Sequence, residues 1–186
     1  SAALFIGCGS APVEQTAEVQ VIGHRGGRYE VDENTLSAFV ESYNNGVNSY
    51  ETDIRLTADN ELVISHDETL SRLTPSDGNV EKMTRKEISK VRTDGGNKIL
   101  FADELAKWLS KRDGVYVEWE MKSGGYDDEK LRQYCDKLYK TAMKNRPENS
   151  TYLFTSFDKR TLRMMQSLHP DADLMLIIGK PISDDC

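Results

Sequence analysis

Strand-like and helix-like segments alternate along this 186-residue chain, and polar side chains stand where the strand-like segments end; together these features predict an α/β fold. Short apolar runs alternate from residue 19 onward with stretches whose apolar residues recur at helical spacing. This alternation favours a parallel sheet with crossover helices. A TIM (β/α)8-type barrel is the commonest way to bring many polar groups to strand ends, so we expect that fold.

Six strands and four helices are expected in chain order. The strands occupy residues 19–23, 48–57, 62–67, 115–121, 151–157 and 173–178, and the helices residues 34–45, 103–111, 127–145 and 158–168. Gly46 and Pro147 end the first and third helices. The stretch from Leu70 to Leu100 is polar and rich in glycine, and we expect a small insertion there that covers one side of the rim.

Composition restricts the partners of the chain. The formal net charge is −7, and the sequence has no cluster of lysine and arginine. Binding to nucleic acid requires a basic surface, so we expect no nucleic-acid partner. The sequence contains no apolar run of about 18 residues, and it therefore predicts no transmembrane helix.

Residues 1–18 resemble the end of a bacterial lipoprotein signal followed by a linker. The small and apolar run SAALFIG leads to Cys8, and a polar stretch follows. We expect a partial signal and linker at residues 1–18 and a barrel domain at residues 19–186. Lipidation of Cys8 would attach the protein to a membrane of the bacterial cell envelope, as a periplasmic or extracellular lipoprotein. The alternative is that Cys8 is incidental.

Five polar residues stand at or near the C-terminal ends of predicted strands, where α/β barrels build their active sites. They are His24, Glu51, Asp53, His66 and Glu120. Side chains alternate along a strand, so Glu51 and Asp53 face the same side. Two carboxylates about 4 Å apart repel by roughly 4 kcal/mol at an effective dielectric constant of about 20, so the acids require positive charge.

Oxygen ligands favour a hard divalent cation, Ca²⁺ or Mg²⁺, as the source of that charge. The alternative is a structural ion network with three nearby basic residues. These are Arg25, Arg55 and Lys122.

Seven short elements occur in a fixed order along most of the chain. They are His-Arg, Glu-Asn-Thr, Glu-x-Asp, Thr-x-Asp and His-Asp within residues 24–74, then Glu-x-Lys ending at Lys122 and Ser-Phe-Asp at residues 156–158. In order and spacing they resemble the glycerophosphodiester phosphodiesterase family. An ordered match of several elements is far more specific than a single short motif.

The resemblance implies a TIM barrel and metal-dependent hydrolysis of a glycerophosphodiester to sn-glycerol 3-phosphate and an alcohol. It implies that His24 and His66 are the acid-base pair and that Arg25 and Lys122 contact the phosphate. It assigns the metal to three acids, Glu51, Asp53 and Glu120. Two histidines suit this chemistry near neutral pH.

The chain departs from the family pattern at Asp32, where proline is usual, and after residue 186, where two more βα units are expected. We therefore expect a barrel that lacks those units. Two alternatives remain open: phospholipase D-like action on lysophospholipid in the same barrel, and a non-catalytic lipoprotein that binds lipid head groups. The leaving alcohol, the choice between Ca²⁺ and Mg²⁺, and the roles of the two histidines are also open.

Five further residues receive supporting roles. We expect Glu33 to hold the rim loop, Asn34 to cap the first helix, and Asp67 to play a structural part, with orientation of His66 as the alternative. Glu118 is expected to form a salt bridge below Glu120, and His169 to lie at the surface.

Overall fold

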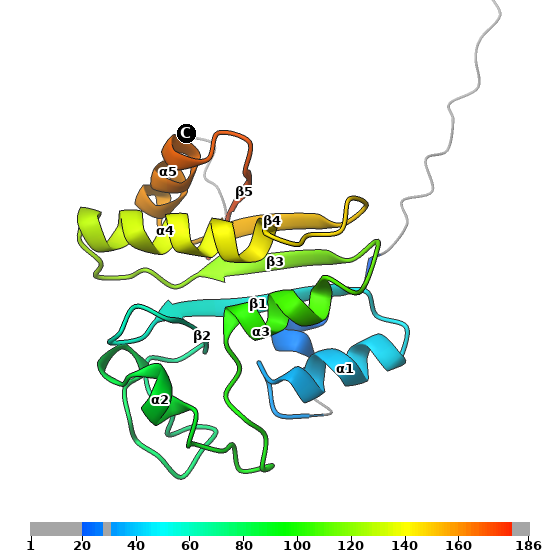
Figure 1. Ribbon diagram of the computed structural model, residues 1–186, viewed down its shortest axis with the longest axis vertical. Coiled ribbons are helices and arrows are strands. Elements are labelled where there is room, and N and C mark those ends of the chain that lie inside the picture. The colour runs from blue at the N-terminus through cyan, green and yellow to red at the C-terminus, as the bar shows by residue number, and fades with distance from the viewer. Residues whose placement is uncertain (1–19, 28–30, 180–186) are drawn as a thin grey trace, which may run out of the picture.

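A computed structural model describes residues 20–27 and 31–179 and contains one five-stranded sheet in the order β2-β1-β3-β4-β5 (Figure 1). The strands are β1 (Ser49–Leu56), β2 (Leu62–Ile64), β3 (Tyr116–Met121), β4 (Thr151–Ser156) and β5 (Asp173–Leu176). The described strands form an open sheet and do not close into a barrel. The linker and Cys8, on which the lipoprotein prediction depends, lie outside the described residues.

The structure differs from the sequence prediction at two strands: β2 differs in its direction, and residues 20–22 do not form a strand. β1, β3, β4 and β5 pair in parallel, whereas β2 pairs antiparallel to β1 because the short connection between them permits only a hairpin. Residues 20–22 are not a strand, which corrects the prediction for 19–23. Gly23 alone forms a parallel bridge there, with Tyr50.

Five α-helices and two 3-10 turns accompany these strands. They are η1 (His24–Gly26), α1 (Leu36–Asn44), η2 (Val80–Lys82), α2 (Arg85–Ile88), α3 (Ala102–Leu109), α4 (Asp128–Met143) and α5 (Lys159–Leu168). Asp127 caps α4 and Asp158 caps α5, each accepting a hydrogen bond from a backbone N–H in the first turn. No helix within the described part of the chain is long and apolar enough to cross a bilayer.

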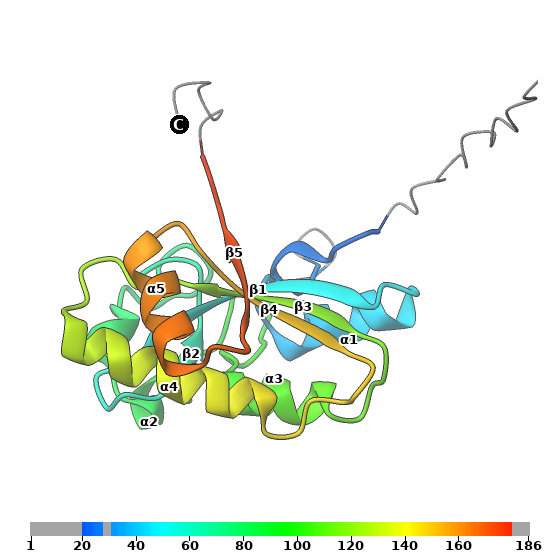
Figure 2. The same cartoon turned by 90° about the horizontal axis from the view of Figure 1, so that it is seen from above.

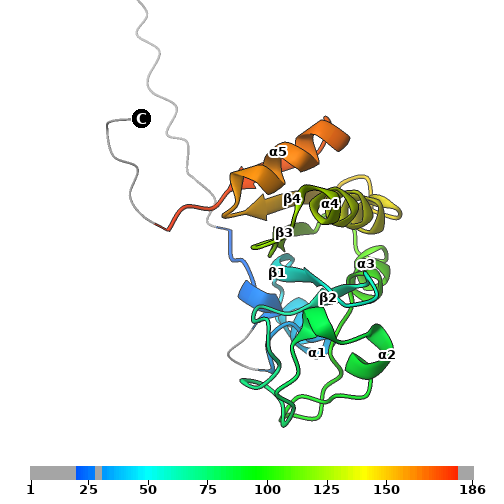
Figure 3. The ribbon, with the colours of Figure 1, turned by 90° about the vertical axis from the view of Figure 1, so that its left-hand side faces the viewer.

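The core lies between the sheet and a row of helices, α3, α4 and α5, that follows one of its faces (Figure 2 and Figure 3). Tyr50 and Ile54 of β1 and Trp119 of β3 are fully buried against this row. Alternation along the strands therefore sends Glu51, Asp53 and Glu120 to the other face, as the sequence predicts.

The predicted insertion from Leu70 to Leu100 contains η2 and α2 and builds a second, smaller core against β2. Its buried members are Val63, Leu70, Val80, Ile88, Ile99 and Phe101. Because Val63 belongs to β2 and Phe101 immediately precedes α3, this core attaches the excursion to the main domain at both of its ends.

Truncation of Leu105 tests the main core. Leu105 of α3 is 0 % exposed, and Leu105→Ala is expected to lower the free energy of unfolding by about 2–5 kcal/mol because it removes packed methyl groups and leaves a cavity. Urea denaturation measures this loss. The matched control is Leu36→Ala in α1, where the side chain is 38 % exposed and a loss under about 1 kcal/mol is expected. Equal losses in the two variants would contradict the packing described.

Candidate active site

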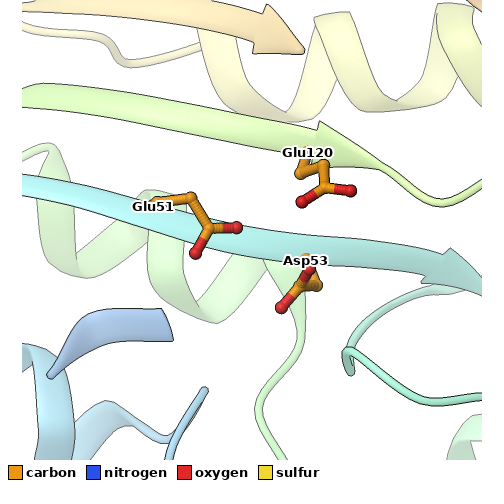
Figure 4. A group of neighbouring side chains, drawn as sticks. All are labelled: Glu51, Asp53 and Glu120. Atoms are coloured by element: carbon orange, nitrogen blue, oxygen red, sulfur yellow. The ribbon is translucent and has the colours of Figure 1, made fainter. Parts of the chain in front are cut away.

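Three buried carboxylates form the centre of the site. Glu51 and Asp53 alternate on β1, and Glu120 on β3 lies directly opposite Asp53 in the parallel register. One oxygen from each acid lies within 4.8 Å of the others. Figure 4 shows the three side chains gathered on the same side of the two neighbouring strands. Strand parity and register, rather than loops, thus bring the acids together.

This acid cluster has less positive charge around it than its carboxylates require. Burial, and next the charge of Asp53, raise the pKa of Glu51 to about 8. Burial also raises the pKa of Glu120, against the opposing effect of Lys122. The Oε1 atom of Glu51 is buried and accepts no hydrogen bond from residues 20–27 or 31–179. An unpartnered carboxylate oxygen among buried acids fits a hard divalent cation, which binds oxygen ligands.

Two basic residues approach the acid cluster, and a third does not. The Lys122 ammonium contacts Glu120 and lies 3.1 Å from Asp53 Oδ1. The Arg25 guanidinium lies 3.7 Å from Asp53 Oδ2. Arg55 instead pairs with Glu81 at 3.2 Å, so the ion-network alternative is wrong for this residue. The remaining two leave Glu51 Oε1 without a partner.

The turn at η1 directs two groups toward Glu51. Arg25 adopts a left-handed conformation (φ 54°), and its backbone N–H donates to Glu51 Oε2 at 2.9 Å. The Nε2 atom of His24 lies 3.6 Å from the same oxygen. Gly26 makes the turn possible: its φ is 79°, and a Cβ there would lie 3.0 Å from the Phe39 ring.

His66 follows β2 and is held at two points. Its Nδ1 atom lies 2.6 Å from Asp67 Oδ1, so Nε2 is the ring nitrogen available for proton exchange. Arg55 donates to the His66 carbonyl from Nε and Nη2, at 3.2 and 2.9 Å. Asp67 therefore orients the imidazole, which is the alternative to a purely structural role.

Asn34 is a site residue that the sequence interpretation missed. It was predicted to cap α1, but Thr35 is the cap and accepts from the Ala38 N–H. Asn34 has a φ of 57°, donates through Nδ2 to Asp53 Oδ2 at 2.9 Å, and accepts from Thr52. The sequence signal for this role was weak. Asparagine tolerates a left-handed backbone conformation, but its position before a helix does not indicate that it adopts one.

Two neighbours of the acid cluster also differ from expectation. The Glu118 carboxylate accepts a hydrogen bond from the Tyr116 hydroxyl at 2.8 Å, in place of the predicted salt bridge, and it is not part of the acid cluster. His169 does not lie free at the surface. It stacks on Tyr139 with ring centroids 3.8 Å apart, away from the site.

Asp32, where the resemblance leads us to expect proline, ties the rim loop to the end of the insertion. Its carboxylate accepts hydrogen bonds from Thr93 Oγ1 and from Asn97 Nδ2, the second at 2.9 Å. The hydrogen bond from Thr93 is the largest influence on the Asp32 carboxyl and lowers its pKa. The Asp32 carboxylate thus cross-links the rim loop to the insertion.

Comparison with known proteins places this geometry in context. The model of the glycerophosphoryl diester phosphodiesterase family matches residues 24–184. The chain is 31 % identical over 164 residues to a glycerophosphodiester phosphodiesterase of Caldanaerobacter subterraneus subsp. tengcongensis, covering 84 % of this chain and 65 % of that protein. It is 24 % identical to one from Bacillus altitudinis, covering 85 % and 66 %. The chain thus spans just under two thirds of the length of these relatives.

Solved structures agree with the fold. A glycerophosphoryl diester phosphodiesterase of Silicibacter pomeroyi superposes with a TM-score of 0.77 at 25 % identity, covering 85 % of this chain and 64 % of that one. An Oleispira antarctica phosphodiesterase, solved in complex with sn-glycerol-3-phosphate, gives a TM-score of 0.76 at 25 % identity and covers 85 % and 65 %. The likeness confirms the predicted TIM-barrel class, of which the described strands form an open part.

Divalent cations are expected to stabilise the protein through the acid cluster. Addition of CaCl₂ or MgCl₂ should raise the Tm, because a cation that binds only the folded state stabilises that state. Glu120→Gln should abolish the rise, since it removes one of three ligands. Glu118→Gln is the matched control, on the same face of β3 but outside the acid cluster, and should keep the rise. Differential scanning calorimetry measures both; a rise that survives in Glu120→Gln would contradict the assignment.

The Asp32 cross-link is expected to be sensitive to acid. Because the folded-state pKa of Asp32 lies below its ordinary value of 3.8, its stabilisation is present above that value and is lost as the pH falls through the folded-state pKa. Asp32→Ala should therefore be less stable than the unsubstituted protein at neutral pH, with the gap narrowing below about pH 4. Asp94→Ala, an exposed change in the neighbouring turn, is the control. A gap independent of pH, measured by urea denaturation, would refute the linkage.

Proposed function

Because the chain belongs to the glycerophosphoryl diester phosphodiesterase family, we propose that it hydrolyses glycerophosphodiesters to sn-glycerol 3-phosphate and an alcohol. One observation carries the proposal: a histidine lies on each side of the buried acid cluster. His24 Nε2 lies 3.6 Å from Glu51 Oε2, and His66 directly follows Ser65, whose N–H donates to the Asp53 carbonyl at 3.0 Å. A phosphoryl displacement requires an acid and a base on opposite sides of phosphorus.

The surroundings of the acid cluster suit a phosphodiester. A cleft of about 410 Å³ adjoins it, with Glu120, Lys122 and Phe157 among its lining residues. Arg25 and Lys122 are the basic residues nearest the acids, and they provide contacts for the phosphate oxygens. The positive charge of Ca²⁺ or Mg²⁺, when held by the three carboxylates, offsets the negative charge that develops on those oxygens.

The histidines transfer the protons of the reaction. One removes a proton from the attacking water as its oxygen bonds to phosphorus, and the other delivers a proton to the oxygen of the departing alcohol as its bond to phosphorus breaks. Asp67 at Nδ1 leaves Nε2 of His66 as the atom that exchanges its proton. The hydrogen bond from the Arg25 N–H fixes the Glu51 carboxylate beside His24. The protein thereby orients the His66 imidazole before substrate arrives.

Turnover of glycerophosphocholine tests this function. His24→Ala and His66→Ala should each lower kcat by about 10²–10⁴-fold, because each removes an acid or a base. EDTA should abolish release of sn-glycerol 3-phosphate, and Ca²⁺ or Mg²⁺ should restore it. His169→Gln is the matched control, since that histidine stacks on Tyr139 away from the site. Turnover that is unchanged in His24→Ala or in EDTA would overturn the mechanism, and binding without any turnover would favour a head-group binder.

A further inference from the structure

Arg72 stands at the start of the insertion and has no role in the proposed chemistry. It lies in a tight turn in which the Leu73 and Thr74 N–H groups both donate to the Leu70 carbonyl. The side chain is 44 % exposed, yet its guanidinium makes two ion pairs with acids from two different loops. Most surface ion pairs involve a single, loosely held partner. Arg72 differs because two nitrogens of its guanidinium each contact a carboxylate.

The first ion pair reaches the imidazole of His66. Arg72 Nε donates to Asp67 Oδ2 at 2.5 Å, while Asp67 Oδ1 lies 2.6 Å from His66 Nδ1. The two oxygens of one carboxylate are therefore shared between the arginine and the histidine. Although burial opposes the change, hydrogen bonds from His66 and Arg72 lower the pKa of Asp67, which stays an acceptor. Fixing Asp67 in this way also fixes the ring plane of His66.

The second ion pair reaches Arg25. Arg72 Nη2 donates to Glu33 Oε1 at 2.6 Å, and Arg25 Nη1 donates to the same oxygen at 2.8 Å. Glu33 is 7 % exposed, so its carboxylate has little freedom to find other partners. Arg25 is the residue whose backbone N–H holds Glu51. The position of the Arg25 side chain thus depends on a carboxylate that Arg72 helps to hold.

We propose that Arg72 is a positioning residue that couples His66 to Arg25 by bridging Asp67 and Glu33. The planar guanidinium presents two nitrogens at a fixed separation, and each reaches a different carboxylate. A lysine at this position carries the charge on one compact ammonium and lacks the two separated nitrogens that meet the two carboxylates from fixed positions. This role rests on the proposed function, because His66 and Arg25 take their significance from it.

The test combines turnover with an observation that does not need turnover. In the full chain, Arg72→Gln should lower kcat/KM for glycerophosphocholine by about 10–100-fold, the usual cost of losing an orienting partner. Arg72→Lys should recover only part of the loss, and millimolar guanidinium should partly restore Arg72→Ala, because the site is half-exposed. Arg92→Gln is the matched control in the same insertion, since among the described residues Arg92 donates to the backbone carbonyls of Ser89 and Val91 and to no carboxylate.

The imidazole of His66 gives the independent readout. The chain has three histidines, so ¹⁵N NMR resolves the ring signals, and His66→Gln identifies the one from His66. We expect a protected Nδ1 proton in the unsubstituted protein and in Arg92→Gln, and its rapid exchange with water in Arg72→Gln and Asp67→Asn. An unchanged His66 signal in Arg72→Gln would overturn the positioning role. Loss of that signal in a protein without any turnover would instead sustain the positioning role and refute the proposed function.

Discussion

The structure depends on the burial of three like charges on two adjacent strands. Parallel register sets Glu120 opposite Asp53, and strand alternation adds Glu51 on the same face. None of them can turn away, because the opposite face of both strands is filled by side chains such as Trp119. The packing of the helices therefore keeps the three acids together. The surrounding residues must compensate their negative charge.

Four consecutive residues of the rim loop connect the acid cluster to the elements around it, and each makes a different contact. Asp32 accepts from the turn that ends the insertion, Glu33 gathers two arginines, Asn34 donates to Asp53, and Thr35 starts α1. The left-handed conformation at Asn34 lets neighbouring side chains leave the backbone in different directions. One short segment thus joins the acid cluster, the insertion and the first helix, so a displacement of this loop would disturb all three together.

Sequence reasoning succeeded where local pattern decides the outcome. Helical spacing found α1, α3, α4 and α5, and parity placed Glu51, Asp53 and Glu120 on one face. It failed where the outcome depends on which segments meet in space. The antiparallel direction of β2 could have been inferred from its short connection to β1. The contacts of Asn34 with Asp53 and of Arg72 with Glu33 could not, because they join residues far apart in the sequence.

The second core changes what the insertion contributes. Leu70 is buried in that core, and its backbone anchors the turn that carries Arg72. Apolar packing of Leu70 therefore fixes the backbone near Arg72, while the Arg72 guanidinium contacts Asp67 and Glu33 at the site. The main core fixes the acids, and the smaller core fixes the residue that aligns His66 with Arg25. A substitution deep in the smaller core would thus act on the site through geometry, although its side chain touches none of the reacting groups.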